Sequence, residues 1–271
     1  MSGQRASRLP EADASKLRDT AKIVGWGLAI YGAMAIVNAY MKHNAVGALA
    51  VQAVMAEFGA GRLAIAWSDP TGPVPTTSSI ARRAGKGAAL GALAAGLVVV
   101  FAWATHAATF APTKPTPMML GVGLLTAGLL SMKDELLLRG VVLRALRNSA
   151  PPYVGLLVCG LAGAAASLGS MGDVPAGAAF PWREPLMAGL LAVSFAVLWM
   201  QDRGAWLAWG AHAAWVWTNG PVLRGGLADL RWAPGSWGGG EMTASTAATV
   251  AVAAITLGAV AFHVRRPRKV A

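Results

Sequence analysis

The sequence has little charge and almost no cysteine. Only 13% of its 271 residues are charged and 55% are hydrophobic, whereas a soluble domain has about 25% charged residues. A chain this apolar, with a mean hydropathy of +0.51, is not intrinsically disordered. Cys159 is the single cysteine, so an intrachain disulfide is excluded. Together these features predict a polytopic membrane protein.

Signatures of several other protein classes are also missing. The N-terminus lacks the short apolar core and small-residue cleavage site of a removable signal peptide, so we expect the first apolar stretch to be retained as a span. The sequence contains no Walker loop, dinucleotide fingerprint, HExxH or CxxC motif. The net charge of +11 does not indicate nucleic-acid binding, because the basic residues form short runs between apolar stretches.

Eight apolar stretches approach the length of about 20 residues that a helix needs to cross a bilayer. They comprise residues 23–41, 45–67, 88–110, 118–132, 154–171, 186–200, 205–217 and 244–264. The fourth is short, and we expect it to continue as a helix past Lys133 to about Arg147. The sequence thus predicts an all-α membrane protein with about eight spans.

The distribution of basic residues predicts the topology. With the N-terminus in the cytoplasm, 17 Lys and Arg side chains fall on the cytoplasmic side and five on the other, with Arg62 inside the second span. We therefore expect a multi-pass protein of the inner (cytoplasmic) membrane. Residues 1–22 are its cytoplasmic N-terminal segment, 23–264 its transmembrane domain and 265–271 a basic cytoplasmic tail.

Four segments outside the spans have expected roles. Residues 69–79 read as an irregular cytoplasmic connection and residues 219–240 as an extracytoplasmic loop, since both are rich in turn-forming residues. Arg144, Arg147 and the C-terminal tail are expected to contact anionic lipid headgroups. Lipid and a membrane protein or peptide are the expected partners.

The densest group of ionisable residues lies at the end of the fourth stretch. Glu135 and Arg139 are four residues apart with the acid first, the favourable arrangement for a helical ion pair. Asp134 points about 100° away on a helix, so its carboxylate stays free for proton chemistry. Ionisable groups at membrane depth are costly and therefore candidates for function. Alternatively, these residues mark where the helix leaves the bilayer.

His212 is the second candidate, because it lies near the middle of the seventh stretch among small residues. Asn219 follows seven residues later, on nearly the same face if the helix continues that far. The alternative for His212 is a hydrogen bond that only supports helix packing.

These two segments resemble motifs of the CPBP family, the CAAX prenyl proteases and bacteriocin-processing membrane proteins. The family's first motif is Glu-Glu-x-x-x-Arg, and Asp134, Glu135 and Arg139 match it with Asp in place of the first Glu. The segment around His212 is similar to the last motif, His-x-x-x-Asn. The resemblance covers residues 118–220, and the eight-span count fits the family.

The resemblance implies an intramembrane endopeptidase of the glutamic type. Asp134 would be the base that activates water, Glu135 and Arg139 would support it, and His212 would be a catalytic histidine. The family's Phe-x-x-x-His motif aligns with residues 163–167, which puts Ser167 at the histidine position. Val216 stands where the family has Asn, and Asn219 is the nearest substitute. One histidine beside an acid is a poor zinc site, so no metal or other cofactor is expected.

Two classes of function remain open at this stage. The first is a working or weakened peptidase whose variant site contains Asp134, His212 and either Ser167 or Asn219. The second is a proteolytically silent relative that binds membrane segments or acts as a scaffold. Loss of Asp134 distinguishes them, since it inactivates a peptidase and is tolerated by a scaffold.

Overall fold

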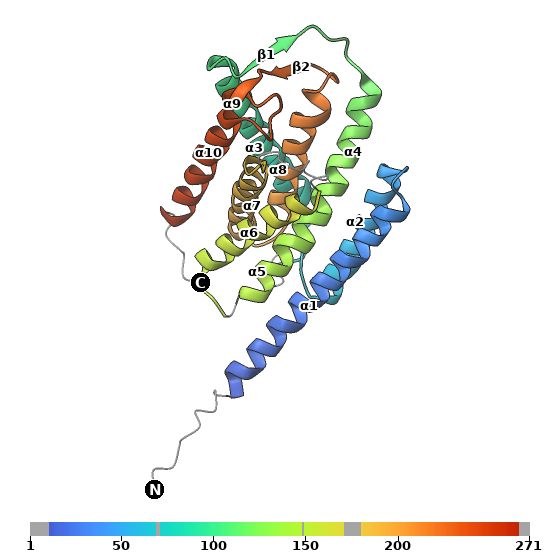
Figure 1. Cartoon of the computed structure of the whole chain (residues 1–271). Helices are drawn as coiled ribbons and strands as arrows, with labels where there is room; N and C mark the ends of the chain where they lie inside the picture. The colour runs from blue at the N-terminus through green and yellow to red at the C-terminus, as the bar shows by residue number, and fades with distance from the viewer. Residues whose placement is uncertain (1–10, 69–70, 148, 171–179, 266–271) are drawn as a thin grey trace.

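The computed structural model describes residues 11–68, 71–147, 149–170 and 180–265, and nearly all of its regular structure is helical (Figure 1). The long helices are α1 (Glu11–Tyr40), α2 (Ala45–Arg62), α3 (Thr77–Ala104), α4 (Pro117–Asp134), α6 (Pro152–Ser170), α7 (Arg183–Asp202), α8 (Trp206–Trp217) and α10 (Thr246–Arg265). The short elements are the π-helical segments η1 (Glu135–Gly140) and η2 (Thr218–Val222), helices α5 (Val141–Leu146) and α9 (Gly235–Gly238), and strands β1 (Ala108–Ala111) and β2 (Asp229–Trp232). The predicted all-α membrane-type fold is confirmed.

Four helices are long and apolar enough to cross a membrane by themselves. They are Arg18–Tyr40 within α1, Thr77–Ala104, Arg183–Asp202 and Thr246–Arg265. A further apolar stretch, Pro152–Leu168, is slightly shorter. These helices mark the chain as a membrane protein.

Several helix boundaries differ from the sequence-based prediction. Helix α1 begins at Glu11, inside the segment that was expected to precede the first span. Helix α3 occupies 77–104 rather than 88–110, because Thr76 caps its start by accepting a hydrogen bond from the Ser79 amide. It ends before His106, whose φ of +57° is incompatible with a continuing right-handed helix. Parts of the predicted segments 1–22, 69–79, 154–171 and 265–271 lie outside the described residues.

A small two-stranded sheet was not predicted. Strands β1 and β2 pair antiparallel, with Ala108 opposite Trp232 and Ala111 opposite Asp229. The sheet lies at one end of the molecule beside α9, at the top of Figure 1. Residues 219–240, expected to form an extracytoplasmic loop, therefore contain most of η2 together with β2 and α9.

The fourth helix continues past Lys133, as the sequence predicted. Helix α4 runs directly into η1, which runs into α5, and the helical path ends at Leu146. The middle section is π-helical over Glu135–Gly140. This local widening has no signature in the sequence, and π-helical turns occur frequently at functional sites.

Glycines bring α8 into close contact with α3, its most extensive neighbour. A Cβ atom built on Gly87 would lie 2.0 Å from the Leu207 carbonyl oxygen, and one on Gly91 would lie 2.0 Å from the Ala211 carbonyl oxygen. Gly210 of α8 approaches the Ala84 carbonyl oxygen equally closely. Small residues of this kind allow close helix packing in membranes, and here they fix the position of the helix that carries His212.

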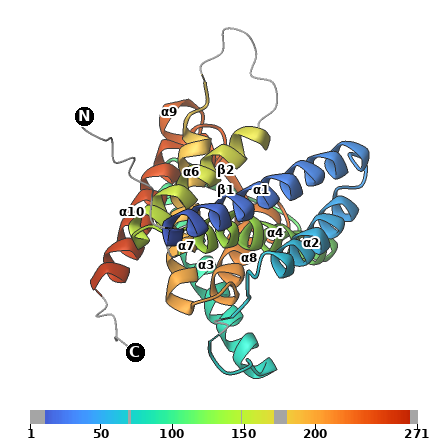
Figure 2. The same cartoon turned by 90° about the horizontal axis from the view of Figure 1, so that it is seen from below.

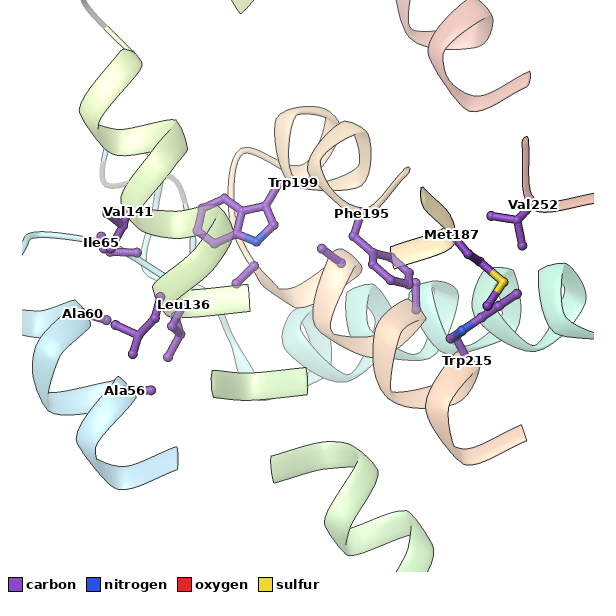
Figure 3. Packing of buried hydrophobic residues seen from close by; sticks show 14 of the residues in the cluster. Ala56, Ala60, Ile65, Leu136, Val141, Met187, Phe195, Trp199, Trp215 and Val252 are labelled. Atoms are coloured by element: carbon purple, nitrogen blue, oxygen red, sulfur yellow. The ribbon is translucent and has the colours of Figure 1, made fainter. Parts of the chain in front are cut away.

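The main hydrophobic core connects α2 and η1 with α7 and α8. Figure 3 shows Ala56 and Ala60 of α2 against Leu136 of η1, while Phe195 and Trp199 of α7 lie between these residues and Trp215 of α8. Helices α1 and α2 project to one side of the other helices when the molecule is seen from below (Figure 2). The core therefore surrounds η1, where the acidic residues lie.

Candidate functional site: a buried Glu–Arg–His cluster

The π-helical segment η1 places Glu135 in the interior. Its side chain is fully buried, and the neighbouring Leu136 and Leu137 belong to the hydrophobic core. Gly140 ends the segment, and a Cβ there would lie 2.6 Å from Ile65 Cγ2. The absence of a side chain at Gly140 thus lets the chain after α2 close over this end of η1.

Glu135 has two basic partners, and both contact the same carboxylate oxygen. Arg139 Nη1 lies 2.8 Å from Glu135 Oε1, which is the ion pair expected from the four-residue spacing. His212 Nδ1 lies 3.0 Å from the same Oε1. The structure therefore brings together three of the residues that the two motifs contain, although Glu135 and His212 are 77 residues apart in sequence.

Phe195 of α7 completes the cluster. Its ring stacks on the His212 imidazole, with centroids 4.6 Å apart and an interplanar angle of 23°. The Arg139 guanidinium carbon lies 5.0 Å from the centroid of the Phe195 ring, a cation–π contact. The sequence analysis missed Phe195, because an aromatic residue in an apolar span has no distinguishing signal.

Several polar atoms of the cluster have no partner among the described residues. They include Glu135 Oε2, Arg139 Nε and Ser131 Oγ, all buried. Buried polar atoms are normally hydrogen-bonded, and exceptions often have a catalytic role or bind water. Ser131 precedes Glu135 by one helical turn, a spacing that could have identified it in the sequence.

This arrangement can support acid–base chemistry. A carboxylate that accepts a hydrogen bond from Nδ1 fixes the neutral imidazole in the tautomer whose Nε2 is a base. Among the described residues, Nε2 of His212 has no hydrogen-bond partner. Arg139 holds the same oxygen of Glu135 that contacts Nδ1, so the ion pair keeps this oxygen beside the ring.

Asp134 lies apart from this cluster. The Tyr31 hydroxyl of α1 lies 3.4 Å from Asp134 Oδ1, and Lys133 Nζ lies 3.6 Å from the same oxygen. Asp134 thus faces α1, while Glu135 faces α8. The structure pairs His212 with the second acid of the motif rather than the first.

Ser167 and Asn219 bond to the backbone of their own segments. The Ser167 hydroxyl of α6 donates to the Ala164 carbonyl at 2.8 Å. The Asn219 amide donates to the Trp215 carbonyl at 3.1 Å, and its side chain lines a separate cavity of about 310 Å³ with Arg224 and Glu241. Val216, four residues after His212, packs against the hydrophobic core.

In the part of the chain that the structure describes, no group of three or more His, Cys, Asp or Glu side chains is arranged to hold a metal ion. Glu135 and His212 alone supply two ligands, whereas a catalytic zinc site has three protein ligands.

The fold and the site define a helical membrane protein with a buried acid–arginine–histidine cluster. Residues 112–218 match the family model described as Rce1-like, Type II CAAX prenyl endopeptidase Rce1-like. This match confirms the resemblance to the CPBP family, and the matched segment includes η1 and α8. Searches of curated proteins and of solved structures found no match.

Proposed function

We propose that the protein is an intramembrane endopeptidase that cleaves membrane proteins or membrane-associated peptides, with Glu135 and His212 as its acid–histidine pair. The 3.0 Å contact between His212 Nδ1 and Glu135 Oε1 carries this proposal. It lies inside the segment that matches a CAAX-type endopeptidase family. The cluster is buried among apolar side chains, where a hydrogen bond is electrostatically stronger than in water.

In the proposed reaction, His212 is the general base. Its Nε2 removes a proton from water as the water oxygen bonds to the peptide carbonyl carbon. The same nitrogen then returns the proton to the departing amide nitrogen as the C–N bond breaks. Glu135 stabilises the imidazolium between these steps, and Arg139 holds Glu135 in place through their ion pair.

The tetrahedral intermediate needs a hydrogen-bond donor for its oxyanion. Val216 occupies the position of the family's asparagine and cannot supply one. Arg139 Nε is a buried donor with no partner among the described residues, so we assign it this role. Arg139 would then both orient Glu135 and bind the oxyanion.

The experiment compares the N- and C-termini of membrane proteins in cells that lack the gene and in cells complemented with variants. Wild type is expected to restore a set of cleaved termini, and Glu135→Gln and His212→Ala are expected to abolish it while accumulating normally. Asp229→Asn is the control, because it makes the same carboxylate-to-amide change in an exposed pair with Arg231.

Asp134→Asn separates the two possible acids. If Asp134→Asn removes the cleaved termini and Glu135→Gln preserves them, the base is Asp134, as the motif predicts, and the Glu135–His212 assignment is wrong. If wild type and every variant reverse the effect of losing the gene, and no cleaved termini are detected with any of them, the protein is the silent binding or scaffold relative. Ser167 at the family's histidine position and Val216 at its asparagine position favour that second candidate.

We further propose that the protein lies in the inner membrane and crosses it eight times, with both ends of the chain in the cytoplasm. The basic residues support this topology, as does the position of the β1–β2 sheet opposite the ends of α5 and α10 (Figure 1). In a Cys159→Ser background, a membrane-impermeant thiol reagent should label Leu227→Cys in intact cells. It should label Val74→Cys, at a site 91% exposed, only after permeabilisation. The reverse pattern would invert the topology.

A further inference from the structure

A large cavity lies away from the Glu135 cluster. Helices α1, α2 and α5 enclose about 1010 Å³ between them. The wall includes Trp26 and Ile30 of α1 and Met55 and Phe58 of α2, which are large and apolar. Trp26 and Phe58 are also largely exposed at the outer surface of the molecule. In a membrane, this cavity is open to the surrounding lipid.

One end of the cavity is basic. Lys22 of α1, Arg62 at the end of α2 and Arg144 of α5 all line it, together with a single carboxylate, Asp19. No ion pair joins these three cations to any described residue, and the Arg62 guanidinium carbon lies 5.5 Å from the centroid of the Phe58 ring. The Thr20 hydroxyl donates to the Ala145 carbonyl at 3.1 Å, which holds the start of α1 against the end of α5.

The basic character continues beyond this cavity. Arg144 also lines an adjoining cavity of about 380 Å³, to which Arg147 and Arg203 contribute. Arg144, half-buried between the two cavities, is thus the cation that both share. Cations with apolar surroundings are costly to keep unpaired, so an anion is the expected complement at this position.

We propose that this cavity binds an anionic phospholipid, with the phosphate at Lys22, Arg62 and Arg144 and an acyl chain along the apolar wall. Lys and Arg are the usual partners of phosphate oxygens, and basic pockets between membrane helices bind lipid headgroups. The lateral opening makes the bilayer the source of the occupant. This inference concerns a site separate from the peptidase cluster and does not depend on its activity.

The test measures lipid binding by native mass spectrometry on purified, delipidated full-length protein titrated with phosphatidylglycerol or phosphatidylcholine. Phosphatidylglycerol should bind in preference to phosphatidylcholine. The triple variant Lys22→Gln, Arg62→Gln, Arg144→Gln should weaken phosphatidylglycerol binding by about 100-fold, because each cation near an anionic lipid contributes about fivefold. Soluble glycerophosphoglycerol should not compete, because it lacks the acyl chains.

The control variant removes three basic residues elsewhere, at Arg82, Lys86 and Arg265, so that its net charge equals that of the triple variant. Equal loss of affinity in both would mean non-specific attraction and would overturn the proposal. A second variant, Ala33→Trp, fills the apolar part of the cavity and keeps all three cations. Unchanged affinity in this variant, or recovery of a bound polypeptide instead of lipid, would equally refute the site.

Discussion

The close approach of α3 to α8 leads to a prediction that links helix packing to the site. Gly91→Ala would put a Cβ atom 2.0 Å from the Ala211 carbonyl oxygen, whereas carbon–oxygen contacts of this kind are normally about 3.3 Å or longer. Because the obstacle is backbone, α8 must move by about 1.3 Å. His212 is the next residue after Ala211, so its 3.0 Å contact with Glu135 would exceed hydrogen-bond length.

The expected change in the free energy of unfolding for Gly91→Ala is the sum of two opposing effects. Overpacking a tight interface costs about 3 kcal/mol at the upper end of the usual range, while replacing a helical glycine by alanine returns about 1 kcal/mol. We therefore expect Gly91→Ala to reduce the free energy of unfolding by about 2 kcal/mol. If the proposed peptidase chemistry is correct, cleavage should fall by about 100-fold, the effect of a 1 Å misplacement.

Gly96→Ala provides a matched control on the same helix. No atom lies within 4 Å of a Cβ at Gly96, so this change should leave stability unchanged or raise it by up to about 1 kcal/mol. The assay is unfolding in mixed detergent followed by the fluorescence of the 11 tryptophans. Indistinguishable midpoints for the two variants would refute the argument that glycine contacts position α8.

Three further predictions concern stability in the same assay. Arg139→Met should destabilise by about 3–5 kcal/mol, because it leaves the Glu135 charge buried with one partner fewer; a cost as small as that of Arg231→Met, in an exposed pair, would contradict this reasoning. Ser245→Ala should cost about 1–2 kcal/mol, since the buried hydroxyl accepts from the Ala248 amide near the start of α10 and donates to the Trp237 carbonyl. His106→Gly should stabilise by about 1 kcal/mol, because glycine adopts the φ of +57° without penalty; a lower midpoint would show that the ring has a role of its own.

The sequence was sufficient for the features that depend on local spacing. The ion pair between Glu135 and Arg139 follows from a four-residue separation, and the continuation of the fourth helix past Lys133 follows from uninterrupted helix-forming residues. The apolar stretches likewise predicted the helices, with errors mainly at their ends. The end of α3 was misplaced because residues 105–110 are apolar enough for a span, yet they turn at His106 and pair with β2.

Features that depend on tertiary contacts could not be predicted from the sequence. Adjacent acids on a helix differ by about 100° in direction, so the sequence alone cannot state which of Asp134 and Glu135 faces α8. The answer depends on the π-helical register of η1 and on the placement of α8 by glycines of α3. Phe195 belongs to the cluster only because α7 packs beside α8, a contact without a local signal.

The departures from the family's motifs have unequal consequences for the cluster. Asp at position 134 shortens a side chain that faces Tyr31 and Lys133, so it leaves the acid beside His212 unchanged. Val216, in contrast, removes a donor from the helix that carries the histidine. The proposed peptidase activity therefore depends less on the substituted acid than on whether Arg139 can replace the lost donor. Because Arg139 is fixed between Glu135 and the Phe195 ring, that replacement is possible only if substrate reaches Nε without breaking the ion pair.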